Sequence, residues 1–328
     1  MSLALRIIAS TEIARAVCLG DFFRATEPEK ARIMWDAGVY DAGVQFFTTG
    51  SSLNDTTAAD VAKEHGRKGV GSFAFGTCPD SKSGPRTWIA FFPSPVAATI
   101  VDDLLNVPAK GACEELMVRS VGLTGPSQKV GNVSGGRWKL PRKNGIVTVT
   151  CSHDAPTAKK PSRTGPELWF SIPTGKGPAS TVPGDEFLKD ANQTQDFKRA
   201  LATWINKVRD LEGLTTLRQV SLPDAPDLSK SATPLHDRKL MAKLRAIARK
   251  HEELALTGED RVIARSLQDA AWLLWNSPRH RDLLLSVSSR SILVQTTTDA
   301  VTGMTTASLL LFSPTDGKSG KSQDLRKR

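Results

Sequence analysis

The segment from Val118 to Gly177 constrains the fold of this chain more than any other part of it. The segment is dense in Gly, Pro, Ser, Thr and Lys, with short β-prone runs between these residues. This composition is typical of β-ribbon and loop. The segment also contains 10 basic and 2 acidic residues, within a chain whose net charge is +10. We therefore expect one strongly basic β region between two parts of different character.

An Asn-Gly dipeptide predicts the position of a hairpin in this region. Asn144-Gly145 stands directly before the β-branched run Ile146–Thr150, and this combination is a strong local hairpin signal. The preceding arm, Arg137–Lys143, contains Pro141, which cannot donate to a strand ladder and belongs at an edge or a bulge. A further arm over Glu167–Ile172 is expected to complete the sheet.

The N-terminal part mixes helix and strand signals. Thr26 followed by Glu29 is a capping-box pattern, and it predicts a helix over Glu27–Ala37 that stops at Gly38. The other elements predicted in this part are strands over 70–75 and 87–92, and a helix that opens at Ser94-Pro95 and ends before Pro108.

The C-terminal third is predicted to be helical. Apolar residues recur at three- and four-residue spacing from Phe197 to Leu211, and Gly213 marks the end of that helix. The same spacing predicts helices over Leu240–Leu254 and Ile263–Leu274, a short helix from Ser277-Pro278, and a closing hairpin of strands 292–298 and 307–312.

These elements together predict an α+β protein. We expect a mixed N-terminal part (1–117), a basic β-ribbon segment (118–184), a helical part with a terminal hairpin (185–314) and a disordered basic tail (315–328). No run approaches the roughly 20 apolar residues that cross a bilayer, so we expect no membrane partner.

The cysteine pattern predicts reduced thiols. Cys18, Cys78, Cys113 and Cys151 are far apart, and none belongs to a CxxC pair. Few cysteines in a long chain are typical of a reducing compartment. We therefore expect the protein in the cytoplasm or within a virion.

Catalytic and cofactor motifs are incomplete in this sequence. No full phosphate-binding loop, dinucleotide fingerprint, nucleophile elbow or HExxH pair is present, so no cofactor and no metal is predicted. Cys151 with His153 and Asp154 is a compact reactive group, although a strand alone explains this spacing. Asp185, Glu186 and Lys189 faintly resemble a metal-dependent nuclease site, but carboxylates at a helix start are also ordinary dipole partners.

Cations and aromatic residues alternate in the basic segment, and this pattern indicates nucleic-acid binding. Cations neutralise phosphates, and exposed aromatic faces stack unpaired bases, which suits single-stranded RNA. The competing interpretation is that the cations are merely solvated and the tryptophans are core residues. The candidate binding residues are Arg137, Trp138, Lys139, Arg142, Lys143, Lys159, Lys160, Arg163 and Trp169.

Three functions remain open from the sequence. The first is a non-catalytic, sequence-tolerant RNA-binding protein that self-associates, as a nucleocapsid or coat-type protein would. The second is an enzyme acting on nucleic acid or a nucleotide, since active-site residues can be distant in sequence. The third is a protein-interaction adaptor whose interface contains Trp272, Trp275 and Leu283–Leu285.

Overall fold

The computed structural model shows an α+β protein with six helices and several antiparallel sheets in the residues that it describes. Those residues are 25–42, 44–49, 72–78, 86–92, 98–107, 115–132, 137–152, 167–194, 196–222, 224–228 and 238–315. The chain divides into two compact units. Unit 1 contains residues 1–180 and 276–278, and unit 2 contains residues 181–275 and 279–328. None of the described helices is both long and apolar enough to cross a membrane.

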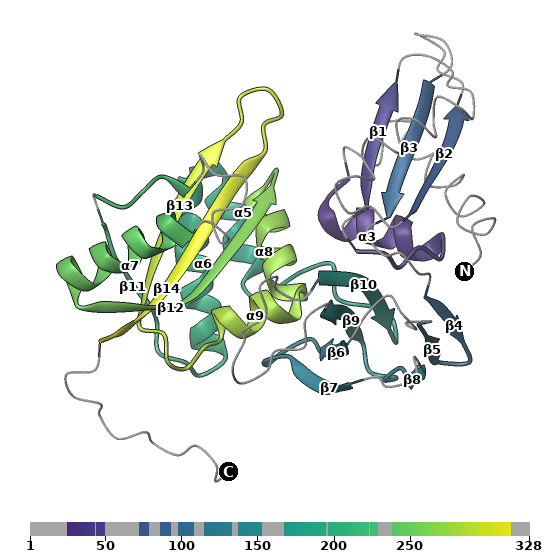
Figure 1. The fold of residues 1–328 in the computed structure, drawn as a ribbon, viewed down its shortest axis with the longest axis horizontal. Coiled ribbons are helices and arrows are strands. Elements are labelled where there is room, and N and C mark those ends of the chain that lie inside the picture. The colour runs from purple at the N-terminus through teal and green to yellow at the C-terminus, as the bar shows by residue number, and fades with distance from the viewer. Residues whose placement is uncertain are drawn as a thin grey trace. The chain divides into compact units, whose positions relative to one another are not determined.

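Unit 1 contains one described helix and ten strands, which Figure 1 labels. Their bounds are α3 (Glu27–Asp36), β1 (Gln45–Thr49), β2 (Ser72–Cys78), β3 (Arg86–Phe92), β4 (Thr99–Val101), β5 (Leu104–Asn106), β6 (Glu115–Val121), β7 (Gln128–Asn132), β8 (Arg137–Lys139), β9 (Gly145–Ser152) and β10 (Glu167–Thr174). The strands form three sheets, in the orders β1-β3-β2, β10-β9-β6-β7 and β4-β5-β8.

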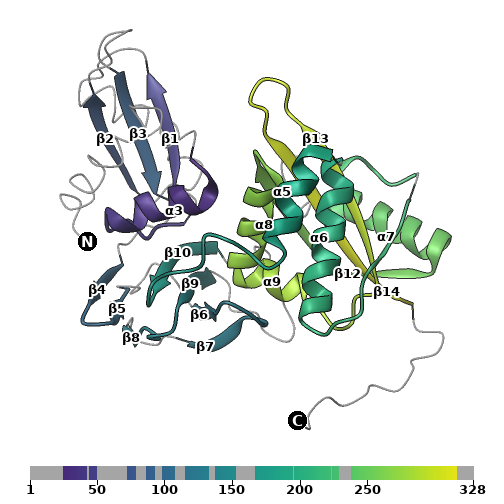
Figure 2. The same ribbon diagram turned by 180° about the vertical axis from the view of Figure 1, so that it is seen from behind.

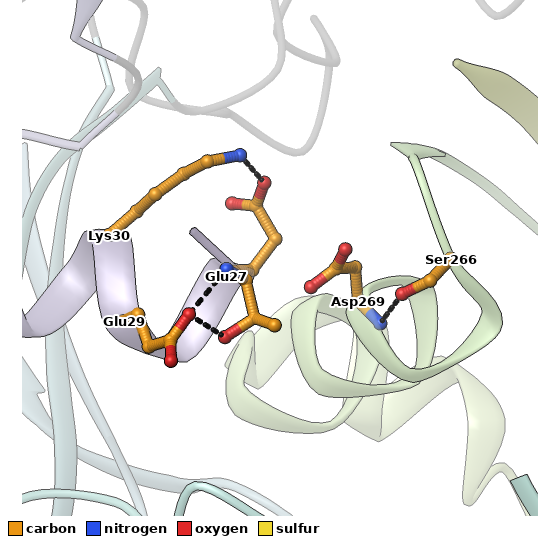
Figure 3. Close-up of polar contacts among 6 residues, drawn as sticks. Glu27, Glu29, Lys30, Ser266 and Asp269 are labelled. Atoms are coloured by element: carbon orange, nitrogen blue, oxygen red, sulfur yellow. Dashed lines mark hydrogen bonds and ion pairs between the residues drawn. The ribbon is translucent and has the colours of Figure 1, made fainter. Parts of the chain in front are cut away.

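Helix α3 begins as the capping-box pattern predicts. The Glu29 carboxylate accepts hydrogen bonds from the Thr26 backbone N–H, at 2.7 Å, and from the Thr26 hydroxyl, at 2.9 Å (Figure 3). These bonds lower the pKa of Glu29. One turn of the helix is also bridged by an ion pair of 2.6 Å between Lys30 and Glu27. The predicted helix over 27–37 is thus confirmed.

The predicted helix from Ser94 to before Pro108 is wrong, because the structure forms the β4–β5 hairpin there. Asp102 and Asp103 lie between the two strands with φ angles of 49° and 62°. Two successive left-handed residues make the tight turn that matches the twist of paired strands, and aspartate tolerates this conformation. The apolar residues that resembled a helix face therefore pair across the hairpin, with Val101 opposite Leu104.

Strand β9 is the centre of the larger sheet and lies between β10 and β6, so the strand predicted over 146–150 is confirmed. The predicted partner is wrong, because β8 pairs with β5 and not with β9. Both sheets contribute to one core, in which Leu105 of the smaller sheet packs with Val147, Val149 and Phe170 of the larger one. The Asn-Gly dipeptide therefore opens β9 without closing a hairpin onto β8.

Gly145 occupies a position that has no room for a side chain. A Cβ added there would collide with the backbone carbonyl of Val121, the neighbour of Ile146 on β6. We expect Gly145→Ala to destabilise the protein by about 2–3 kcal/mol, because a backbone clash forces the two strands apart. Chemical denaturation would measure this. Gly122→Ala is the matched control, since a Cβ there would lie 3.8 Å from its nearest neighbour, and an equal loss in both variants would contradict the prediction.

Unit 2 contains five described helices and four strands. Their bounds are α5 (Asp185–Thr194), α6 (Phe197–Leu211), β11 (Arg218–Gln219), α7 (Arg238–Glu252), β12 (Leu254–Ala264), α8 (Leu267–Asn276), α9 (Pro278–Leu284), β13 (Ser291–Thr298) and β14 (Thr305–Pro314). The four strands form one sheet in the order β11-β13-β14-β12. The Ser266 hydroxyl accepts the Asp269 N–H at 3.1 Å and caps α8 (Figure 3).

Helices cover both faces of this sheet. Helix α7 lies on one side, and α5, α6, α8 and α9 lie on the other, as the two opposite views show (Figures 1 and 2). Leu310 and Phe312 of β14 pack in the cluster formed with α7. Their neighbours Leu309 and Leu311 are fully buried and, because side chains alternate along a strand, point to the opposite helices.

The sequence prediction succeeds for most of unit 2 and fails at one long strand. Helices α6 and α9 and the closing β13–β14 hairpin form as predicted. Leu254 and Ile263, which were assigned to helix faces, lie instead in β12, an eleven-residue strand that pairs with β14. The long pairing with β14 overrides the local helical spacing of these residues.

Candidate nucleic-acid interface

Strand β8 presents two of the predicted cations to solvent. Arg137 and Lys139 are exposed, and Trp138 between them is half-buried. Trp138 lies opposite Leu105 and packs against the shared core of unit 1. Because side chains alternate along a strand, the two cations share the outward face with the exposed Leu104. The geometry therefore separates the cations from the aromatic side chain that the sequence pattern had grouped with them.

The loop between β8 and β9 carries Arg142 and Lys143, and hydrogen bonds hold this loop in place. The Thr174 hydroxyl donates a 2.8 Å hydrogen bond to the Lys143 carbonyl, and the Lys176 N–H donates a 2.9 Å bond to Oδ1 of Asn144. Between them, Gly175 has a φ of +59°, and a Cβ there would approach the Arg142 carbonyl to 2.8 Å. The loop is thus clamped by the turn that follows β10.

This clamp adds a cation that the sequence prediction missed. Lys176 is exposed and stands beside the loop that carries Arg142 and Lys143. The charge excess of the segment includes Lys176, but only the pairing of β9 with β10 brings it there. We call the exposed cations of β8, of this clamped loop and of the turn after β10 the β8 basic surface, and its members are Arg137, Lys139, Arg142, Lys143 and Lys176.

One aspartate, Asp103, borders the β8 basic surface. Asp103 forms an ion pair of 3.7 Å with Arg142, and both side chains are mostly exposed. The Asp103 carbonyl also accepts the Leu140 N–H at 2.8 Å, which ties the β4–β5 turn to the end of β8. An exposed pair of this length contributes little stability, so Arg142 can exchange Asp103 for a phosphate.

The other four predicted binding residues lie wholly or partly outside the described part of the chain. Lys159, Lys160 and Arg163 lie outside the described residues, and so do His153 and Asp154. Trp169 belongs to β10, where the register shifts between Leu168 and Phe170, but its side chain lies outside the described part. The stacking role assigned to Trp169 stays a prediction.

Cys151 overturns the expectation of reduced thiols. It is fully buried in β9 and is disulfide-bonded. A sulfur in a disulfide has no thiolate to act as a nucleophile, so the proposed reactive group of Cys151 with His153 is excluded while this bond is intact. Disulfides are typical of oxidising compartments and of virion surfaces.

Unit 2 contains a buried acid and histidine that the sequence analysis did not single out. His280 of α9 lies 3.1 Å from Asp260 of β12, between Nε2 and Oδ1. Oδ2 of Asp260 and Nδ1 of His280 are buried and have no hydrogen-bond partner among the described residues. No local sequence pattern marks this pair, because Asp260 and His280 come together only when residues 254–264 form a strand.

Burial shifts the ionisation of this pair in opposite directions. It raises the pKa of Asp260 to about 7, although the Arg261 N–H and the charge of Arg279 act against the shift. It lowers the pKa of His280 to about 4, and Arg279 adds to that effect. Both side chains are therefore driven toward their neutral forms inside the fold.

The opposite face of β12 carries another perturbed acid. Burial raises the pKa of Glu259 to about 7, and the charge of Arg245 on α7 opposes it. Because Glu259 and Asp260 are consecutive on a strand, they point to different faces and do not form one site. Within the described residues, no three His, Cys, Asp or Glu side chains gather in a way that could hold a metal ion.

Comparisons with known proteins add no family. No protein-family model and no curated protein matches the chain. Among solved structures, the chain is similar to a cysteine-rich secretory protein from Staphylococcus aureus subsp. aureus Mu50, at 14% identity over 67% of each chain. The TM-score is 0.28, which is too low to support any argument about fold or function.

Proposed function

We propose that this protein is a non-catalytic, sequence-tolerant RNA-binding protein that contacts the phosphate backbone through the β8 basic surface. The observation that carries the proposal is the exposure of all five cations of that surface, which come from β8, the clamped loop after it and the turn after β10 in the same unit. Cations held on rigid backbone can neutralise successive phosphates without ordering a flexible segment first.

The half-buried position of Trp138 favours backbone contacts over base stacking. A tryptophan that packs against the core offers only part of its ring to a base. Binding should therefore depend on length and charge of the RNA more than on its sequence, because phosphates carry no sequence information.

Self-association in a nucleocapsid or coat-type assembly remains part of the proposal. The large exposed apolar residues of unit 2, Leu211, Ile263, Val287 and Val301, are available for contacts between copies. The disulfide at Cys151 leads us to propose a virion or another oxidising environment in place of the cytoplasm. Light scattering after size exclusion, with nuclease-treated protein, tests whether copies associate without RNA.

The salt dependence of RNA binding tests the proposed function. Five phosphate contacts at about 0.7 released counterions each predict a log-log slope of about −3.5 for single-stranded RNA. The slope should be the same for oligonucleotides of equal length and different base composition. Fluorescence anisotropy between low and physiological salt would measure it. A shallow slope with strong preference for one sequence would sink the proposal.

An enzyme is the second candidate, and the 3.1 Å contact between Nε2 of His280 and Oδ1 of Asp260 is the observation that favours it. A carboxylate that orients an imidazole is the usual support of a general base. However, no described side chain other than Asp260 hydrogen-bonds to the His280 ring. Turnover of RNA that is lost in His280→Gln would promote this candidate.

Most of the residues predicted for an adaptor interface are buried. Trp272 and Trp275 are 7% and 2% exposed, and Leu284 and Leu285 are also buried. A partner that binds this protein would therefore contact other side chains than these four.

A further inference from the structure

The described side chains on the outward face of helix α7 are cations and alanines. The apolar side of the helix, with Met241, Leu244 and Ala248, is buried in the cluster that includes Leu310 and Phe312. The exposed side chains described on the helix are Lys239, Ala242, Lys243, Arg245, Ala246, Arg249 and Lys250, and we call these the α7 outward face. The acid at the end of the helix, Glu252, is held by Arg218 at 2.8 Å.

The helical repeat sorts these residues into rows. With 3.6 residues per turn, the two alanines lie along the middle of the exposed arc. Three lysines, Lys239, Lys243 and Lys250, follow one flank of the alanine strip, and Arg245 and Arg249 follow the other. A long polyanion could lie along the alanine strip, with cationic side chains on both sides of it.

This arrangement is unfavourable for an isolated helix surface. Lys239 with Lys243, and Arg245 with Arg249, are like charges four residues apart, and each such pair destabilises a helix by about 0.2–0.5 kcal/mol. The first turn contains no acid, so its cations face the positive end of the helix dipole. Lys243, Arg249 and Lys250 form no ion pair with any described residue. A bound polyanion would relieve all three effects.

We propose that the α7 outward face is a second nucleic-acid contact, located on unit 2, that binds the phosphate backbone separately from the β8 basic surface. An anionic membrane fits less well, because the apolar side that would enter the lipid is already buried in the core. A protein partner also fits less well, because the face has no aromatic or large aliphatic anchor.

A charge-reversal pair on the full chain tests this contact. Lys243→Glu with Arg249→Glu should weaken binding of a 20-nucleotide oligouridylate about tenfold at low salt, and should reduce the salt slope by about 1.4, because two phosphate contacts are lost. The matched control is Lys198→Glu with Arg199→Glu, two exposed cations of α6 with the same change in net charge. The control should lower affinity less than about threefold. Circular dichroism would confirm that each variant is folded.

The outcomes separate the two surfaces. Equal losses in the α7 variant and the α6 control would overturn the proposal, since net charge alone would explain both. If only charge reversal on the β8 basic surface weakens binding, the proposed function holds and the α7 contact fails. If only charge reversal on the α7 outward face weakens binding, the α7 contact holds and the proposed role of the β8 basic surface fails. Should the α7 variant misfold, the neutral pair Lys243→Gln with Arg249→Gln repeats the test with half the change in charge. Loss of phosphatidylserine-vesicle binding without loss of RNA binding would assign the face to a membrane and overturn the proposal.

Discussion

A chain with Lys139→Glu, Arg142→Glu and Lys143→Glu is expected to bind single-stranded RNA about 30- to 100-fold more weakly at low salt. Each change removes a phosphate contact and adds a repulsive charge on the β8 basic surface. All three side chains are exposed, so the loss should not come from unfolding. Anisotropy titrations measure the affinity, and thermal melts check the fold.

The control for this variant must change net charge equally at another place. Lys189→Glu, Lys198→Glu and Arg199→Glu alter three exposed cations on α5 and α6 of unit 2. We expect this control to retain most of the affinity. A comparable loss in both proteins would mean that total charge, and not the position of the cations, governs binding.

Asp260→Asn should stabilise the protein at pH 8 and change its stability little at pH 4. The pKa of Asp260 is raised to about 7 in the fold, so the stability contributed by its neutral form is complete below its ordinary value of 3.8 and is lost as the pH rises to about 7. The shift corresponds to about 4 kcal/mol at most, and we expect about 2–4 kcal/mol. An asparagine keeps the neutral shape without ionising. Urea denaturation at several pH values would measure the difference.

His280 and Asp299 provide checks on the sign of this effect. The pKa of His280 is lowered to about 4, so the stability that its neutral form contributes is lost as the pH falls from about 6.5 to 4. The stability contributed by neutral Asp260 is lost in the opposite direction, as the pH rises. The exposed Asp299 has its pKa lowered by hydrogen bonds from Thr302 and Val301. Asp299→Asn should therefore be less stable than wild type above pH 4, and the difference should shrink in acid. A parallel pH response in the Asp260 and Asp299 variants would contradict both assignments.

Elements with strong local signals could be predicted from the sequence, and those set by distant pairing could not. The β-branched run after Gly145 and the three- and four-residue spacing of α6 each describe their own segment. In contrast, β12 contains Gly258, Glu259 and Asp260, which have low strand propensity, and it exists because β14 pairs with it from Leu254 to Ala264.

The same division applies to the candidate site. Exposure of Arg142 and Lys143 followed from their place beside a turn, although the hairpin assumed for them does not form. Lys176 joins them only through the β9–β10 register, and no local pattern marks it. Trp138 points inward because it pairs with Leu105 of β5. The sequence did not predict that β8 belongs to the smaller sheet, so it could not predict this position.

Strand β12 also bears on the assembly of copies that we propose for this protein. Among the described strands it lies at one end of the four-stranded sheet of unit 2, and an open strand edge invites pairing with another chain. The register of β12 shifts between Leu256 and Gly258, and the charged residues Glu259 to Arg261 follow at once. A bulge on an edge strand is a device that discourages continuous sheet growth. An ordered assembly of this protein would then join copies through side-chain surfaces, and conditions that flatten this edge would favour fibrous aggregates instead.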